Sequence, residues 1–327
     1  MLYIGKKFKK GEKRMNKLTR KLITSIMTLA FAFIALGTTT FAWFTLSNTV
    51  EVGQFEAKVT AGSGFEVSVD DGINGYEPAH TPNYYTSVPS TVTKNALIKA
   101  GYESDFRLLD LTSPDGKTFN SLSSTGVNSG YIKLQLKFRS PVASTKIYLG
   151  SGTGFDISQS VEQGAVNPGI TWVSDASFTN AKGVAVAEGT STKYFAADAA
   201  RISFSDDDAT APTMVIYEAP TSDTNTVLDN TPIENGSVNY YFVKTGENPT
   251  GFATTTIPSS ITAGLEVVPE EGENLPLVLT LSADVAEDGF YYGILNVRVW
   301  IEGWDPDCFN SILNDILRVN LHFITKE

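Results

Sequence analysis

The stretch from Trp300 to Cys308 (WIEGWDPDC) concentrates side chains that could do chemistry. Within eight residues it holds two tryptophans and three carboxylates: Trp300, Trp304, Glu302, Asp305 and Asp307. The carboxylates are hard oxygen ligands of the kind that Ca²⁺ takes. Indole faces can also stack on sugar rings while carboxylates bind the hydroxyl groups, which would make a glycan platform. A structural interpretation competes with both, because aromatic residues near strand ends often cap a core.

Other catalytic or cofactor chemistry has little support in the sequence. The two histidines, His80 and His322, are far apart, whereas metal and catalytic centres need clustered ligands. The single cysteine, Cys308, excludes an intramolecular disulfide and any zinc site that needs two thiolates from one chain. Its thiol is either buried and inert or paired between subunits. Phosphate-binding loops and a Gly-x-Ser-x-Gly elbow are absent, so we expect no enzyme and no cofactor apart from the Ca²⁺ candidate.

Alternating strands must position this stretch. The run 293–302 leads into it, Gly303 and Pro306 end the strand pattern, and 307–314 is expected to form a helical turn. In YIKLQLKF, residues 131–138, apolar and polar side chains alternate strictly, which indicates a half-buried strand. Further strands are expected at 50–60, 65–69, 146–149, 200–204, 213–217, 275–281 and 316–324.

About ten strands without helical crossovers predict an all-β fold, because each apolar strand face needs a second sheet to cover it. We expect an antiparallel, jelly-roll-like β-sandwich over residues 43–327, with long loop insertions at about 70–128 and 150–198. Segments 50–60 and 65–69, with the turn signal at 70–72, are expected to form a hairpin. A second small β domain is the alternative to a single domain with insertions.

The N-terminus carries an export signal. Nine Lys and Arg residues lie within the first 42 positions, and an apolar run from Leu22 to Gly37 follows the last of them. The basic flank stays in the cytoplasm, so the rest of the chain is expected outside the cell or on its surface. Thr40-Phe41-Ala42 predicts cleavage between Ala42 and Trp43. The alternative is an uncleaved hydrophobic helix over 22–46, which is long enough to anchor the protein in the membrane.

Charge separates the first 42 residues from the rest. Beyond them the chain has 16 basic and 35 acidic residues, a formal charge of −19. Such a surface repels nucleic acids and anionic lipids, so neither is expected as a partner, and membrane contact is expected only through residues 22–46.

The arrangement of the basic run, the apolar segment, Gly37-Thr-Thr-Thr-Phe41-Ala42-Trp43-Phe44 and a following strand resembles the N-terminus of TasA/camelysin-like proteins. These are secreted jelly-roll proteins of Gram-positive bacteria. The resemblance covers roughly the first 70 residues. It implies processing by a SipW-type signal peptidase after export, and self-association in which residues 43–60 add a strand to a neighbouring subunit.

The sequence therefore predicts a secreted or cell-surface structural protein, a subunit of an extracellular fibre or biofilm matrix that assembles by strand addition. Its expected partners are other copies, other surface proteins, and the export machinery with its signal peptidase. The alternative is a glycan-binding adhesin or binding module that uses Trp300 or Trp304. A polysaccharide hydrolase is the least favoured function, because nothing selects a catalytic carboxylate pair among the 36 acids.

Overall fold

The computed structural model divides the chain into two compact units, Met1–Ala42 and Trp43–Glu327. The predicted signal segment, the Ala42–Trp43 cleavage site, His80 and Trp304 lie outside the described residues. Within the described part of the chain, neither helix is long and apolar enough to cross a membrane. The described residues are 56–62, 64–70, 82–102, 108–121, 126–155, 167–206, 213–219, 235–247, 275–303 and 305–326.

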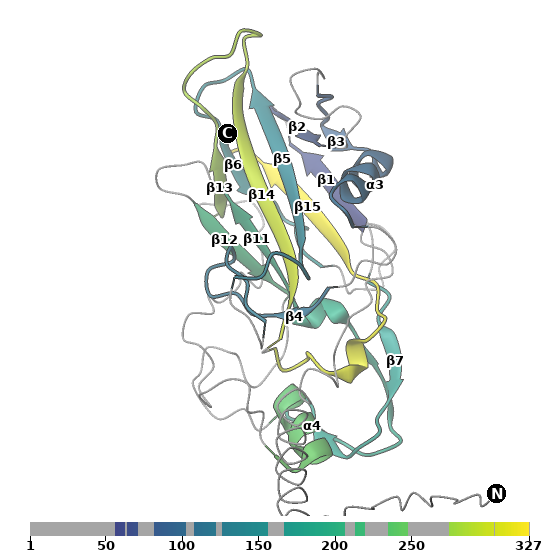
Figure 1. The fold of residues 1–327 in the computed structure, drawn as a ribbon. Coiled ribbons are helices and arrows are strands. Elements are labelled where there is room, and N and C mark those ends of the chain that lie inside the picture. Colours follow the sequence, from purple (N-terminus) through teal and green to yellow (C-terminus); the bar gives the residue numbers. More distant parts are fainter. Residues whose placement is uncertain are drawn as a thin grey trace, which may run out of the picture. The chain divides into compact units, whose positions relative to one another are not determined.

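Strands dominate the described residues and most neighbouring strands run antiparallel, which confirms the predicted all-β class (Figure 1). The described helices are α3 (Ser90–Lys99), α4 (Gly236–Thr245) and the short 3-10 helices η1 (Ala196–Ala199) and η2 (Asn310–Ile312). The strands are β1 (Glu56–Ala61), β2 (Glu66–Val69), β3 (Ser87–Val88), β4 (Asp110–Leu111), β5 (Ile132–Ser140), β6 (Lys146–Leu149), β7 (Ile170–Val173), β8 (Phe178–Thr179), β9 (Ala185–Val186), β10 (Ser191–Tyr194), β11 (Ala200–Ser205), β12 (Met214–Glu218), β13 (Leu277–Thr280), β14 (Tyr291–Glu302) and β15 (Arg318–Ile324).

Two sheets form the body of the fold. The five-stranded sheet has the order β13-β6-β15-β1-β3, and the six-stranded sheet has the order β12-β11-β14-β5-β2, with β4 added beside β14. Val59 and Leu321 of the first sheet share one core cluster with Leu136 and Val297 of the second. The sheets therefore face each other across a common apolar core, as the alternating pattern predicted.

Strand β5 follows its predicted pattern closely. Its buried residues Ile132, Leu134, Leu136 and Phe138 alternate with more exposed polar residues. The β5 backbone pairs with β14 over nine residues and with β2 over four. Because successive side chains of a strand point to opposite faces, the alternation fixes which face of β5 meets the core.

Two details of the strand pairing differ from the expectation. β1 and β2 do not form a hairpin, because β1 belongs to the five-stranded sheet and β2 to the six-stranded one. Both strands need to bury one apolar face, and Val59 and Val67 do so from opposite sides of the same core. β1 also runs parallel to β15. This direction is available because the two strands are joined through most of the chain and not by a tight turn.

The predicted insertion at 150–198 contains the small two-stranded sheets β7-β10 and β8-β9. Its aromatic residues build a local core in which the Trp172 ring lies edge-on to four neighbours, at centroid distances of 5.7–6.2 Å. The four are Phe178, Tyr194, Tyr240 of α4 and Phe309. Edge-to-face packing of this kind adds to the apolar burial, so it ties the insertion to α4 and to the segment after β14.

Candidate functional site

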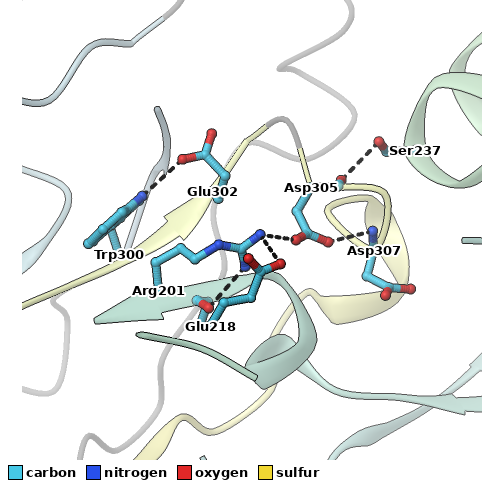
Figure 2. Close-up of polar contacts among 8 residues, drawn as sticks. Arg201, Glu218, Ser237, Trp300, Glu302, Asp305 and Asp307 are labelled. Atoms are coloured by element: carbon cyan, nitrogen blue, oxygen red, sulfur yellow. Dashed lines mark hydrogen bonds and ion pairs between the residues drawn. The ribbon is translucent and has the colours of Figure 1, made fainter. Parts of the chain in front are cut away.

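The turn that follows β14 brings the three predicted carboxylates into one enclosed region (Figure 2). The Asp305 amide donates to the Glu302 carbonyl oxygen at 3.0 Å, and the Cys308 amide donates to the Asp305 carbonyl oxygen at 2.9 Å. The Asp305 Oδ1 accepts the Asp307 amide at 2.8 Å. These hydrogen bonds close the turn locally, while Asp305 also directs its other carboxylate oxygen toward the six-stranded sheet.

Arg201 is the partner of that carboxylate. It lies on β11, between its register partners Trp300 of β14 and Glu218 of β12. One guanidinium nitrogen, Nη2, lies 2.6 Å from the Asp305 Oδ2 and 2.6 Å from the Glu218 Oε1. The Nη1 donates to the Ala200 carbonyl oxygen at 3.1 Å. One buried cation thus joins the turn to strands β11 and β12.

Burial decides the electrostatics of this pair. The side chains of Arg201 and Asp305 are 2% and 1% exposed. Burial acts to lower the pKa of Arg201, but Asp305, Glu218 and Glu302 outweigh it and raise that pKa, so the guanidinium stays charged. Burial raises the pKa of Asp305, and the positive charge of Arg201 opposes the rise. Each charge makes the burial of the other tolerable.

The start of α4 is hydrogen-bonded to the turn. The Ser237 hydroxyl donates to the Asp305 carbonyl oxygen at 3.0 Å, and its amide donates to the Pro306 carbonyl oxygen at 2.7 Å. Gly236 packs so closely that an added Cβ would lie 2.3 Å from the Pro306 oxygen. Strand β4, which pairs parallel with β14, also contacts the turn, since its Leu111 carbonyl oxygen accepts the Gly303 amide at 2.8 Å. The turn therefore holds β4 and α4 in addition to β11 and β12.

Trp300 caps a second apolar cluster on the outer face of the six-stranded sheet. The indole is 1% exposed and packs with Leu111, Phe119 and Ile216, and its ring centroid lies 5.3 Å from that of Phe119. The indole Nε1 donates to the Glu302 Oε2 at 3.1 Å. Stacking on a glycan was the wrong interpretation of Trp300, because the ring faces are covered by protein.

The carboxylates do not form a calcium site. Glu302 accepts from Trp300, Asp305 binds Arg201, and Asp307 uses its amide within the turn. Within the described residues, no group of three or more Asp, Glu, His or Cys side chains could hold a metal ion. The sequence placed these residues together correctly, but the Glu302 carboxylate binds an indole and the Asp305 carboxylate binds a guanidinium.

Cys308, the single cysteine of the sequence, is a buried free thiol. Burial raises the pKa of its thiol well above the usual value, and the negative charges of Asp110, Asp305 and Glu302 add to the effect. Because the thiolate is the reactive form, this thiol is inert at neutral pH. Of the two alternatives for Cys308, the structure supports the buried one.

Sequence reasoning missed Arg201, Glu218 and Ser237. Arg201 sits on the polar side of the strand ARISF, where alternation indicates a solvent-facing residue. A signal was present, because an acid-rich turn that becomes buried needs a cation. Five segments meet at this enclosed turn, namely β4, β11, β12, β14 and α4. The charged groups at this turn bind each other, so the turn stabilises the contact between these five segments.

No known protein family, no curated protein and no solved structure matches this chain.

Proposed function

We propose that the protein is a non-enzymatic structural protein, exported to the cell surface or the extracellular matrix, whose jelly-roll-like sandwich polymerises by exchanging its first strand. The observation that carries the proposal is the position of β1. It is the first described strand after the predicted signal, and it lies between β15 and β3 inside a sheet. Export is supported by the basic and apolar pattern of residues 1–42, followed by a strongly acidic chain.

The pairing of β1 suits an exchangeable strand. It pairs with β15 over six residues, from Glu56↔Arg318 to Ala61↔Phe323, but with β3 over only two. Its Val59 side chain is fully buried, so the place that β1 occupies is specific for an apolar residue at that point. In an assembly, β1 of one copy would take the same place in the next copy and make the same contacts.

Cysteine trapping tests the exchange. Thr60 and His322 are register partners on β1 and β15, and both are partly exposed. Neighbouring strands lie about 4.8 Å apart, within the reach of a disulfide. Mixed single variants Thr60→Cys and His322→Cys should give covalent dimers on oxidation. The double variant should form an internal bond that blocks assembly until it is reduced. Cys308 can stay, because its thiol is buried.

The control links two strands that are not exchanged. Thr171 and Lys193 are exposed register partners on β7 and β10, so a disulfide between Thr171→Cys and Lys193→Cys should leave assembly unchanged. If the oxidised Thr60→Cys/His322→Cys protein assembles as well as the reduced one, β1 exchange is wrong. If the wild-type protein stays monomeric at high concentration, the fibre proposal fails as a whole.

The export step has its own test. N-terminal sequencing of protein recovered from culture medium should begin at Trp43, which leaves Ala42 as the last residue of the signal. Recovery of the intact N-terminus from a membrane pellet would favour the anchor at 22–46 instead. Recovery from the cytosol would contradict export.

A further inference from the structure

The outward face of β5 carries a row of basic residues on an otherwise acidic chain. Lys133, Gln135, Lys137 and Arg139 alternate with the buried side chains of the strand, so all four lie on the same outer face. Alternate residues of a strand are about 6.6 Å apart, so the row is about 20 Å long. Three of the 16 basic residues beyond position 42 belong to this one strand. We refer to these four residues as the β5 row.

Aromatic rings lie beside Lys137 and Arg139, the C-terminal half of the β5 row. The Arg139 guanidinium carbon lies 4.0 Å from the centroid of the Tyr84 ring and 4.4 Å from that of Phe290. The Lys137 Nζ lies 4.7 Å from the centroid of the Tyr292 ring. All three rings are half-buried and come from outside β5. Cation–π contacts of this kind hold a flexible cationic side chain in place and leave it charged.

Two acids complete the arrangement. The Glu66 Oε2 lies 2.6 Å from both the Nε and the Nη2 of Arg139, and the Asp288 carboxylate accepts from the Tyr292 hydroxyl. The side chains of Arg139 and Glu66 are 25% and 36% exposed, so solvent screens this pair and a competing anion can reach it. The acids orient Arg139 and Tyr292 but offset only part of the positive charge.

We propose that the β5 row, with Tyr84, Phe290 and Tyr292 around it, is a docking surface for a carboxylate-bearing polysaccharide. Charge complementarity selects an anionic partner. The outward positions of β5 are Lys, Gln, Lys and Arg, a row of charges about 20 Å long that suits an extended chain of repeated anionic groups. Sugar rings can pack beside the aromatic side chains while carboxylates reach the cations. This inference does not depend on strand exchange.

The acidity of the whole chain gives the binding an unusual salt dependence. The chain beyond residue 42 has a formal charge of −19 and repels any polyanion at long range. At 0.1 M salt the Debye length is about 10 Å, shorter than the β5 row, so the repulsion is screened while close contacts persist. We expect affinity to rise from about 0.01 M to about 0.1 M salt and to fall again toward 1 M.

Binding of the chain from Trp43 to Glu327 to polygalacturonate tests the proposal, with neutral dextran and poly-glutamate as comparison polymers. The double variant Lys133→Gln/Lys137→Gln should weaken binding about tenfold, because two cations that displace counterions are lost. The matched double variant Lys146→Gln/Lys182→Gln changes the net charge equally at exposed sites elsewhere, and it should bind like the wild type.

A gain of affinity gives the sharper test. Glu66→Gln removes the carboxylate that competes for Arg139 and should strengthen binding several-fold, whereas Glu188→Gln, an exposed site elsewhere, should not. The inference is overturned if wild-type protein does not bind polygalacturonate, or if both lysine pairs or both glutamate variants act alike. Equal binding of poly-glutamate would overturn the assignment to a glycan, because the rings would then contribute nothing.

Discussion

Arg201 and Arg139 make similar ion pairs in different surroundings. Arg201 lies 2.6 Å from the carboxylates of Asp305 and Glu218, and Arg139 lies 2.6 Å from that of Glu66. The Arg201 side chain is 2% exposed and the Arg139 side chain is 25% exposed. The first pair is enclosed by an apolar cluster and a turn, while the second lies among aromatic rings at the surface.

This difference shows that burial, more than the pairing itself, decides what an ion pair does. Water and salt screen a surface pair, so losing one partner changes little. A buried pair has no solvent to replace a lost partner, and the remaining charge stays uncompensated. We therefore assign Arg201 to the stability of the fold, and the exposure of Arg139 is compatible with its place in the proposed docking surface.

The largest expected effect comes from removing the Arg201 guanidinium, and the same change at Arg139 is the comparison. Arg201→Met should lower the free energy of unfolding by about 3–5 kcal/mol, because it leaves the Asp305 carboxylate buried without its cation. Arg139→Met should cost less than about 1 kcal/mol. Urea unfolding of both variants, followed by circular dichroism, measures the two costs on one scale.

A companion variant keeps that comparison interpretable if Arg201→Met folds poorly. Replacing Arg201, Glu218 and Asp305 together with Met, Met and Leu removes Arg201 and both of its ion-pair partners and should recover much of the lost stability. Equal costs for Arg201→Met and Arg139→Met would show that burial does not separate the two pairs.

The two ends of α4 extend the comparison to the backbone. Gly236 and Gly246 both have positive φ, +62° and +76°, but only Gly236 abuts the Asp305 turn. Gly246→Ala should cost about 1–2 kcal/mol from backbone strain alone. Gly236→Ala should cost about 1–3 kcal/mol more, because its Cβ would meet the Pro306 carbonyl oxygen. Melting temperatures compare the two, and equal losses would mean that the turn does not hold α4.

Alternation in the sequence predicted most strands of the two large sheets, but not the short strands β3 and β4. The β5 pattern predicted the strand and its buried face, since one apolar face per strand dictates its orientation. The run into Trp300 predicted a strand, but β14 is buried on both faces from Leu295 to Glu302. The parallel pairing of β1 with β15 was not predictable, because nothing local in either segment encodes a partner so distant in the chain.

The candidate site was predicted in its position but not in its use. The sequence placed Glu302, Asp305 and Asp307 together correctly, since neighbours in a turn stay neighbours. Arg201, the partner of Asp305, lies 104 positions from it, and Trp300, its register neighbour, is covered by the segment that contributes Leu111 and Phe119. A pattern read along one strand cannot show that a distant segment covers that strand's outer face.

The smallest expected effect concerns acid sensitivity at a surface carboxylate. Although partial burial acts to raise it, the pKa of Asp175 is lowered by Lys244, 3.0 Å away, and by the Tyr240 hydroxyl. Its pKa shift is thus opposite in direction to that of buried Asp305. A lowered pKa in the folded state means that the unfolded chain binds more protons as pH falls, so stability decreases with acidification.

The contribution of Asp175 should be complete above the unfolded pKa and lost as pH falls through the folded pKa. Because its side chain is 50% exposed, we expect Asp175→Asn to cost only about 0.5 kcal/mol at neutral pH. Urea midpoints of wild type and variant should converge between about pH 4 and pH 2. Lys244→Met should reduce this pH dependence as well, since it removes the charge that lowers the Asp175 pKa. A constant difference down to the lowest pH would mean that this surface pair contributes through packing and not through charge.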